Sequence, residues 1–244
     1  MIIELPEYWN GIPIEGAMER LLAEDKEKET QEQIIQSPIK DNYIYVPSIN
    51  CYLAKQKTHL GLNWYDTHKA LHQENLLMPT IPQFIEFIKH LEANPNGLSD
   101  SSKQEVESIL DDILTIRDPW RAEWLDADFK VDDKKLYIHY NHRTINRQLV
   151  TQNKELLTDY LTKNKTPGID LESWLTNANV QGLPKPEIKS GDLYYWVPIK
   201  DNNSVASFDV YSGRAYLVCD RHPDYTGASL GVRSVCEANA SPQK

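Results

Sequence analysis

Several features of membrane, secreted and nucleic-acid-binding proteins are missing from this chain of 244 residues. No apolar run approaches the roughly 18 residues of a membrane span. The first residues lack a basic segment followed by a long apolar run, so we recognise no signal peptide and leave the localisation open. The net charge is −10, and no basic cluster is visible. We therefore expect a soluble globular protein that has no membrane span and does not bind nucleic acid.

Cysteine is scarce, with Cys51, Cys219 and Cys236 as the three in the chain. An odd and sparse set is not a disulfide framework. Pairing of Cys219 with Cys236 stays open. The favoured interpretation is that the thiols are free and buried, where they act as small apolar groups.

Clear motifs for metal or cofactor binding are also missing. There is no phosphate-binding loop. His68 and His72 lie one helical turn apart, a spacing that can bind metal, but lysine and not glutamate follows His68. Buried histidines beside Trp64 are the preferred interpretation of this pair.

An acidic stretch superficially suggests a calcium loop, but it lacks the glycine and the terminal glutamate of such loops. Its members are Asp126, Asp128, Asp132 and Asp133. A solvated turn is the preferred interpretation. We therefore expect no catalytic residues, no cofactor and no metal site.

The most informative absence lies near the C-terminus. Between Asp201 and Cys236 the chain contains no lysine, glutamate, glutamine, methionine or tryptophan. Strands disfavour glutamate and lysine but accept tryptophan, so a β-rich tract explains only part of this gap. The same five amino acids cannot arise when the first two bases of an asparagine codon are randomised. The tract therefore has the composition of a segment whose codons have been rewritten in that way.

This gap, with the ending Gly227-Ala-Ser-Leu-Gly-Val-Arg233, resembles the variable proteins of diversity-generating retroelements. In that family, adenine-specific mutagenesis rewrites the 3′ end of a target gene. The varied side chains are displayed on a C-type lectin fold and bind ligands. Segments 212–224 and 230–233 are similar to the last strands of that fold in its archaeal branch, and residues 43–95 resemble an archaeal scaffold domain more loosely.

The resemblance implies an α+β, C-type lectin-like fold, in which helices pack on an antiparallel sheet and irregular loops carry the site. We expect an N-terminal helical arm over residues 1–40 and a single domain over 41–244, with the variable region near 201–235. The implied partner is an unidentified protein or cell-surface ligand, and display on a cell or virion surface fits that role. Many animal lectins of this fold use calcium through Glu-Pro-Asn-like ligands, but this chain has no such triplet. The oligomeric state stays open.

Side-chain alternation within the tract separates two faces. The predicted core face consists of Ala206, Phe208, Val210, Ala215, Leu217 and Cys219. The other face, with the loop around Pro223, is the predicted variable ligand-binding surface: Asn203, Val205, Ser207, Asp209, Tyr211, Tyr216, Val218, Asp220, His222, Asp224, Tyr225 and Thr226. Such a mixture of tyrosine with small polar residues is typical of antibody binding loops. The predicted scaffold comprises Gly227, Leu230, Gly231 and Val232, with Arg233 as a buried anchor to backbone or a carboxylate.

Hydrophobic spacing predicts helices mainly in the first half of the chain and strands in the second. The predicted helices cover residues 15–35, 64–74, about 81–91, 102–116, 154–163 and 171–176. The predicted strands cover residues 42–54, 120–129, 135–140 and 193–199, followed by those of the tract.

Two alternative functions remain open at this stage. Formylglycine-generating enzymes share the implied fold and use a C-terminal cysteine pair, and Cys219 and Cys236 lie in the corresponding region. An active thiol needs surroundings that lower its pKa. The other alternative is a viral structural subunit whose polar face contacts a neighbouring subunit. Of these functions, we expect ligand binding rather than catalysis.

Overall fold

The computed structural model of the chain describes residues 8–9, 12–13, 41–93, 100–116, 118, 120–211 and 213–238. The chain divides into two compact units, Met1–Tyr43 and Ile44–Lys244. In the first unit, strand β1 (Tyr8–Trp9) pairs antiparallel with β2 (Ile12–Pro13). The helix predicted over residues 15–35 lies outside the described residues. Within the described part of the chain, no helix combines the length and the apolar character needed to cross a membrane.

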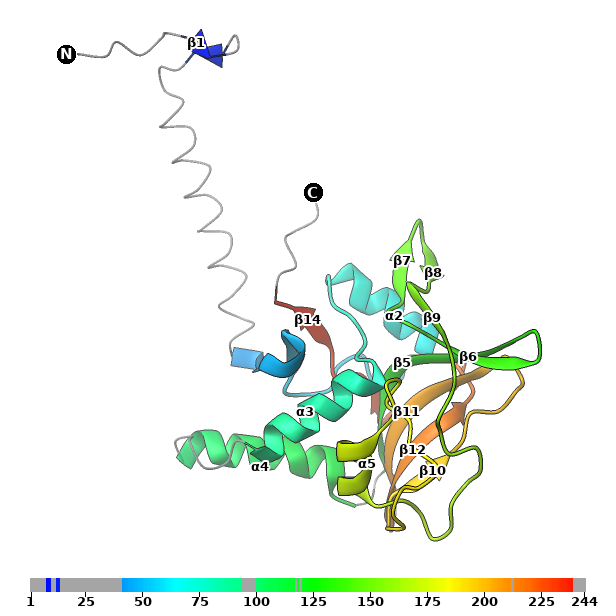
Figure 1. Cartoon of the computed structure of the whole chain (residues 1–244). Coiled ribbons are helices and arrows are strands. Elements are labelled where there is room, and N and C mark those ends of the chain that lie inside the picture. Colours follow the sequence, from blue (N-terminus) through cyan, green and yellow to red (C-terminus); the bar gives the residue numbers. More distant parts are fainter. Residues whose placement is uncertain are drawn as a thin grey trace, which may run out of the picture. The chain divides into compact units, whose positions relative to one another are not determined.

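The second unit is a mixed α+β structure built on a seven-stranded sheet (Figure 1). The strand order is β10-β12-β11-β5-β6-β9, and β13 also pairs with β5. The bounds are β5 (Arg121–Asp132), β6 (Lys135–Tyr140), β9 (Asn153–Leu156), β10 (Tyr194–Trp196), β11 (Ser204–Tyr211), β12 (Arg214–Arg221) and β13 (Leu230–Gly231). Most neighbours are antiparallel, but β10 runs parallel to β12 and β13 runs parallel to β5. The predicted antiparallel sheet is therefore mixed, because two late segments enter it from irregular connections and not from hairpins.

Two smaller sheets flank the large one. One has the order β14-β4-β3, with bounds β3 (Tyr43–Val46), β4 (Cys51–Ala54) and β14 (Val235–Glu237). The other pairs β7 (Arg143–Ile145) with β8 (Gln148–Val150). The strand predicted over residues 42–54 is interrupted by the 3₁₀ turn η1 (Pro47–Ile49), because proline cannot donate a ladder hydrogen bond.

The helices of the second unit are α2 (Trp64–Gln73), α3 (Ile81–Ala93), α4 (Asp100–Leu114) and α5 (Leu171–Asn177). Each matches a predicted helix to within a few residues. Side-chain caps fix where three of them begin, and at α5 the Asp170 side chain accepts a hydrogen bond from the Ser173 N–H at 2.8 Å. The Asn63 side chain accepts a hydrogen bond from the Asp66 N–H at 2.8 Å, and Thr80 and Gln83 form a reciprocal capping box at the start of α3.

The helix predicted over residues 154–163 is wrong. Its beginning is strand β9, whose residues pair with β6 from Tyr137↔Leu156 to Tyr140↔Asn153. Exposure alternates along β9 as it does in a half-buried strand. The spacing of the few apolar residues there is compatible with a helix. Pairing with the neighbouring strand β6 makes the segment a strand instead.

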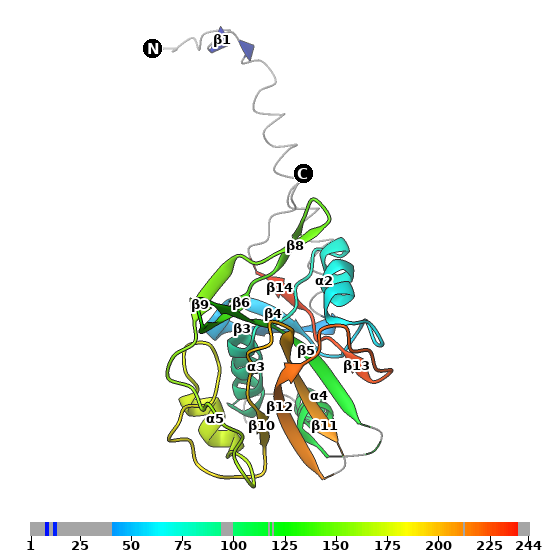
Figure 2. The same cartoon turned by 90° about the vertical axis from the view of Figure 1, so that its right-hand side faces the viewer.

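Both faces of the central strands are buried. On one face, helices α3, α4 and α5 cover the main core (Figure 1), where Phe208 packs against Phe84 and Trp174 with ring centroids 5.2 and 6.1 Å apart. On the opposite face, a second core joins α2 and β13 to the sheet: Trp64, Leu71, Met78, Ala122, Trp124, Val205, Leu230 and Val232. Figure 2 shows α2 and β13 together at one end of the sheet, away from the lower parts of β10 and β12. The second core therefore leaves part of this face open.

Candidate functional site

The structure buries much of the strand face that the sequence assigned to ligand binding. Val205 and Ser207 have no exposed surface, and Asp209 and Val218 are 6% and 7% exposed. The prediction that these four side chains face solvent is wrong. Strand β11 lies between β12 and β5, and the second core covers its outer face beside Val205. The side-chain alternation in the tract therefore separates two faces that are both buried. It does not separate a buried face from a solvent-exposed face.

The remaining predicted site residues keep some contact with solvent. Tyr211 and Tyr225 are 51% and 41% exposed. The other members of the predicted site are exposed at His222, Asp224 and Thr226 and half-buried at Asn203, Tyr216 and Asp220. These positions lie at the ends of strands or in the loop after β12. The predicted core residues, by contrast, are buried, except for a half-buried Ala215.

One line of paired residues across four strands organises the open part of this face. Tyr194 of β10 pairs with Tyr216 of β12, Tyr216 pairs with Asp209 of β11, and Asp209 pairs with Ala122 of β5. Residues directly opposite each other point to the same side of a sheet, as do residues two positions apart. The same side therefore also carries Trp120, Trp196 and Tyr211.

Aromatic side chains gather on this side of the sheet, and each is exposed or half-buried. We name the set the aromatic face: Trp120, Tyr194, Trp196, Tyr211, Tyr216 and Tyr225. The rings of Tyr194 and Tyr216 stack with centroids 5.3 Å apart at an interplanar angle of 11°. The Arg214 guanidinium lies 4.1 Å over the Tyr194 ring and donates a hydrogen bond to the Pro167 carbonyl at 2.9 Å. These contacts hold the side chains in fixed orientations.

A buried ion pair lies beneath the aromatic face. Arg221 donates hydrogen bonds to the carboxylate of Asp209 and, at 2.9 Å, to the hydroxyl of Ser207. Ser207 in turn donates to Asp209 at 2.7 Å. Burial raises the pKa of Asp209 to about 6, against the opposing attraction of Arg221. The Arg221 guanidinium also lies 4.9 Å from the ring of Tyr225, which is itself 6.2 Å from the ring of Trp120.

The loop after β12 is tied down at its main chain. The Tyr225 N–H donates to the His222 carbonyl at 3.0 Å, and the Pro223 carbonyl accepts from the Trp64 N–H of α2 at 2.9 Å. The side chains of His222 and Asn203 are in contact at 2.5 Å. Exposed side chains such as Asp224 are therefore presented on a fixed backbone.

The scaffold role predicted for residues 230–233 is confirmed. Leu230 and Val232 have no exposed surface, and a Cβ added to Gly231 would lie 2.7 Å from the Thr58 carbonyl oxygen. Only glycine permits that close approach of two backbones. Arg233 is fully buried and bonds to the carboxylates of Glu123 and Asp112 and to backbone carbonyls.

Several members of the aromatic face lie outside the residues predicted from sequence. Tyr194 and Trp196 belong to β10, and Trp120 directly precedes β5. The run Leu193–Ile199 did signal a strand rich in aromatic residues. Its parallel pairing with β12, which brings it beside Tyr216, has no counterpart in local sequence.

The cysteines are free. Cys219 lies in the main core, where burial raises the pKa of its thiol well above the usual value. Cys236 lies in β14, and burial raises its pKa as well. Neither environment favours a thiolate.

The two histidines whose spacing suggested a possible metal site, His68 and His72, lie in different surroundings in the structure. His72 is exposed, whereas His68 is buried against Trp64 with ring centroids 4.3 Å apart. His68 instead lies beside Asp126 and His142. Burial lowers the pKa of His68 to about 4, so this ring is uncharged at neutral pH. Asp126 and Asp128 belong to strand β5 and not to a solvated turn.

Comparisons of the chain with protein-family models, with curated proteins and with solved structures found no match in any of the three. Its function is therefore argued from its own residues and geometry.

Proposed function

We propose that this protein binds ligands through the aromatic face, and that the exposed positions of its C-terminal tract are diversified by retroelement mutagenesis on a C-type lectin-like fold. The observation that carries the proposal is the gathering of aromatic side chains from separate strands above the Asp209–Arg221 ion pair. The proposed ligand is a protein or a cell-surface molecule.

The composition of the aromatic face suits recognition. Tyrosine, tryptophan and arginine supply most of the binding free energy in protein interfaces, because their large surfaces are rigid and carry polar tips. Trp196, Tyr211 and Tyr225 are 41%, 51% and 41% exposed. Exposed aromatic residues that cluster on one face mark interaction sites more often than residues scattered singly do. Since the backbone beneath them is a sheet, little ordering entropy is lost on binding.

The arrangement of the tract supports diversification of selected positions. Tyr211, Tyr216, His222, Asp224 and Tyr225 can be exchanged without repacking the core, because none of them is fully buried. Scaffold residues alternate with them, so the fold would be retained while the surface changes. Diversification limited to such positions would alter the partner and leave stability nearly unchanged.

The fold supports the lectin-like part of the proposal in outline. Helices pack on a mixed sheet, and long irregular segments connect β9 to α5 and α5 to β10. Strand β14, near the C-terminus, pairs with β4, near the start of the second unit. The loop over residues 222–229 lies between β12 and β13, where a variable site is expected.

Two further functions fit the sequence less well. A formylglycine-generating enzyme would need a reactive thiolate, yet the pKa values of Cys219 and Cys236 are both raised by burial. A structural subunit would use the aromatic face to contact another copy or a neighbouring subunit. If the protein is a structural subunit, it should self-associate, and substitutions in the aromatic face should abolish this. The oligomeric state of such variants therefore distinguishes a structural subunit from a ligand-binding protein.

The test is a displayed library varied only at exposed tract positions and selected against a panel of unrelated proteins. We expect folded members of the library that bind. In a binder that keeps an aromatic side chain at position 216 or 225, replacing that anchor with alanine should lower the affinity at least about tenfold. Val180, which is 84% exposed and distant in sequence, provides the matched control through Val180→Ala. Folded libraries that never yield binders would contradict the proposal.

The diversification itself is tested in the DNA beside the gene. We expect a near-copy of the last part of the coding sequence that has adenines where the gene differs, next to a reverse-transcriptase gene. If no such repeat lies beside the gene, the proposed diversification by a retroelement is wrong. The proposed ligand binding through the aromatic face would not be affected.

A further inference from the structure

Three buried side chains from separate parts of the fold converge beside α2. His68 lies in α2, Asp126 lies in β5 and His142 follows β6, and they are 4%, 2% and 6% exposed. One nitrogen or oxygen atom from each lies within 4.8 Å of those of the other two. None of these three residues belongs to the aromatic face.

A bulge in β5 places Asp126 in this cluster, because the register between β5 and β11 shifts at this point. The Leu125 carbonyl accepts a hydrogen bond from the Trp64 indole N–H at 3.0 Å. The Trp64 ring then packs edge-on against His68 and His142, with centroids 4.3 and 5.0 Å away. The surrounding fold therefore holds both imidazoles in place.

The hydrogen bonding within the cluster is uneven. His142 Nδ1 lies 2.5 Å from Asp126 Oδ1, and the His142 backbone N–H donates to Asp126 Oδ2 at 2.9 Å. His68 Nε2 is fully buried, lies 3.6 Å from the same Oδ1 atom and has no hydrogen-bond partner. A buried ring nitrogen without a partner loses its hydrogen bond to water and gains none in return, so its retention in a folded protein needs an explanation.

We propose that His68 Nε2, Asp126 Oδ1 and His142 Nδ1 bind a divalent transition-metal ion, for which Zn²⁺ is the best-fitting probe. Two imidazoles and one carboxylate form a donor set that suits Zn²⁺ and neighbouring first-row ions better than Ca²⁺ or Mg²⁺, which prefer oxygen ligands. The lone pair of His68 Nε2 then has a partner. Three protein ligands leave the fourth tetrahedral position to water.

The distances fit this coordination after a small rearrangement. Tetrahedral ligands about 2.1 Å from an ion lie about 3.4 Å from one another. The His68–Asp126 separation of 3.6 Å is already close to this value. The His142–Asp126 separation of 2.5 Å must increase, because a hydrogen bond joins these two atoms in the metal-free protein. On binding, that hydrogen bond breaks and Nδ1 and Oδ1 each bond to the ion. The Nδ1 proton is lost to solvent and Nε2 of the same ring takes one up, so a neutral imidazole binds the metal.

The bound ion would tie α2 to the central sheet. His68 is the cluster's member from α2, while Asp126 and His142 belong to β5 and to the residues after β6. Since the unfolded chain does not hold these groups together, binding adds directly to the free energy of unfolding. The expected role is structural, because the cluster is buried.

The experiment uses the full chain, stripped of metal with EDTA, dialysed, and titrated with Zn²⁺ by calorimetry. We expect a tight site of one equivalent and a Tm that rises by several degrees with Zn²⁺. Co²⁺ bound at the same site should show visible ligand-field absorption, and this absorption should disappear when added Zn²⁺ displaces the Co²⁺. His68→Gln should weaken Zn²⁺ binding by at least about tenfold. The matched control is His72→Gln, on the same helix at an exposed position, which should bind as the wild type does.

Folding of the variants is checked by circular dichroism. His68→Gln keeps the Asp126–His142 hydrogen bond and is expected to fold, and His142→Gln supplies a second test from another segment. Two results would overturn the proposal: no Zn²⁺ binding by the wild type at micromolar concentration, or equal losses in His68→Gln and His72→Gln. The second result would show that Zn²⁺ binds to surface histidines only. Because the aromatic face is unchanged in these variants, ligand selection on it is unaffected by either outcome.

Discussion

Arg233 and Glu123, 110 positions apart in the sequence, form a buried ion pair in which the guanidinium bonds to both carboxylate oxygens. Arg233 Nε lies 3.1 Å from Oε2 of Glu123, and Nη2 lies 3.0 Å from Oε1. Nη2 also donates to Asp112 of α4 at 2.8 Å. One side chain thus joins the C-terminal segment, the central strand β5 and a helix of the main core.

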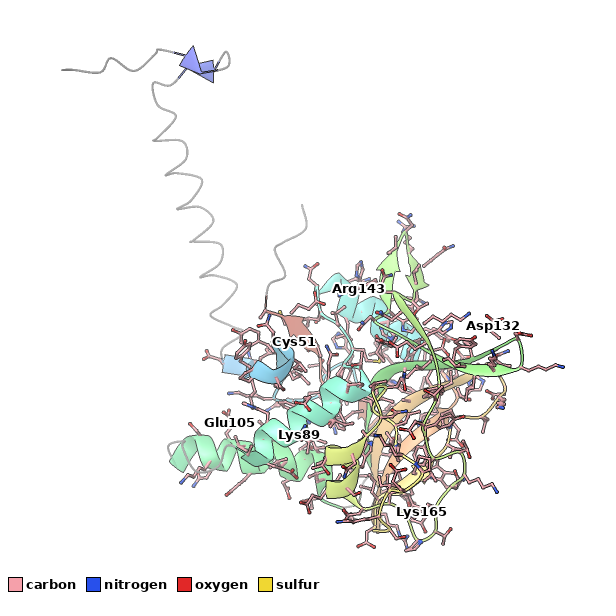
Figure 3. All side chains as sticks on the ribbon, viewed as in Figure 1. Cys51, Lys89, Glu105, Asp132, Arg143 and Lys165 are labelled. Carbon is pink, nitrogen blue, oxygen red and sulfur yellow. The ribbon has the colours of Figure 1, made fainter. Side chains whose placement is uncertain are left out.

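Arg233→Met should destabilise the protein by about 3–5 kcal/mol, because it leaves the Glu123 carboxylate buried without a partner. The matched control is Arg143→Met. Arg143, in β7 (Figure 3), pairs with Glu237 at 2.7 Å. Its side chain is 35% exposed. That exposed pair should contribute under about 1 kcal/mol. Urea unfolding of both variants measures the difference, and similar losses would contradict the anchoring role of Arg233.

Phe208→Ala should cost about 3–5 kcal/mol, because Phe208 is 1% exposed and packs between Phe84 and Trp174 in the main core. Tyr211→Ala, in the same strand, should cost under about 1 kcal/mol, since that ring is 51% exposed. Thermal and urea unfolding provide the measurement. A large loss in Tyr211→Ala would mean that the aromatic face is part of the core.

The raised pKa of Asp209 predicts a pH dependence with a definite sign. Its folded-state pKa of about 6 exceeds the ordinary value of 3.8 for an aspartate, so the folded protein holds an extra proton between these pH values. The free energy of unfolding therefore contains a contribution that is fully present below about pH 3.8 and is lost as the pH rises through about 6. The groups around Asp209 are Arg221 and Ser207, which favour its ionised form, and Asp220, which opposes it.

Asp209→Asn should remove this contribution. Stability measured by urea unfolding between about pH 4 and about pH 6 should then fall less steeply with rising pH, by at most about 1.4 kcal/mol per pH unit. Asp224→Asn, at an exposed loop position, is the control and should follow the wild type. Equal slopes in wild type and Asp209→Asn would show that the carboxyl group is ionised in the folded state at low pH.

Helices α2, α3, α4 and α5 were predicted to within a few residues because their signals are local. Apolar spacing predicted α2 and α3, whose observed bounds differ from the predicted ones by a few residues at most. The scaffold role of Gly231 and Arg233 could also be predicted, since a glycine beside buried apolar residues and a lone arginine in an apolar segment have few other uses. Each of these signals is contained within a few neighbouring positions.

Pairing between distant segments decided the rest. Alternation along residues 203–211 correctly separated two faces, but a strand with neighbours on both sides and a core on each face buries both, as Ser207 and Asp209 show. Sequence periodicity indicates that the two faces of a strand differ in polarity. It does not indicate which other elements cover each face. The grouping of His68 with Asp126 and His142, and of Tyr194 with Tyr216, likewise depends on a bulge and a parallel register that no local pattern specifies. The sequence by itself determined the types of most elements, the scaffold motif and the candidate tract. Only the tertiary structure decided which of its residues reach solvent, because long-range pairing sets burial.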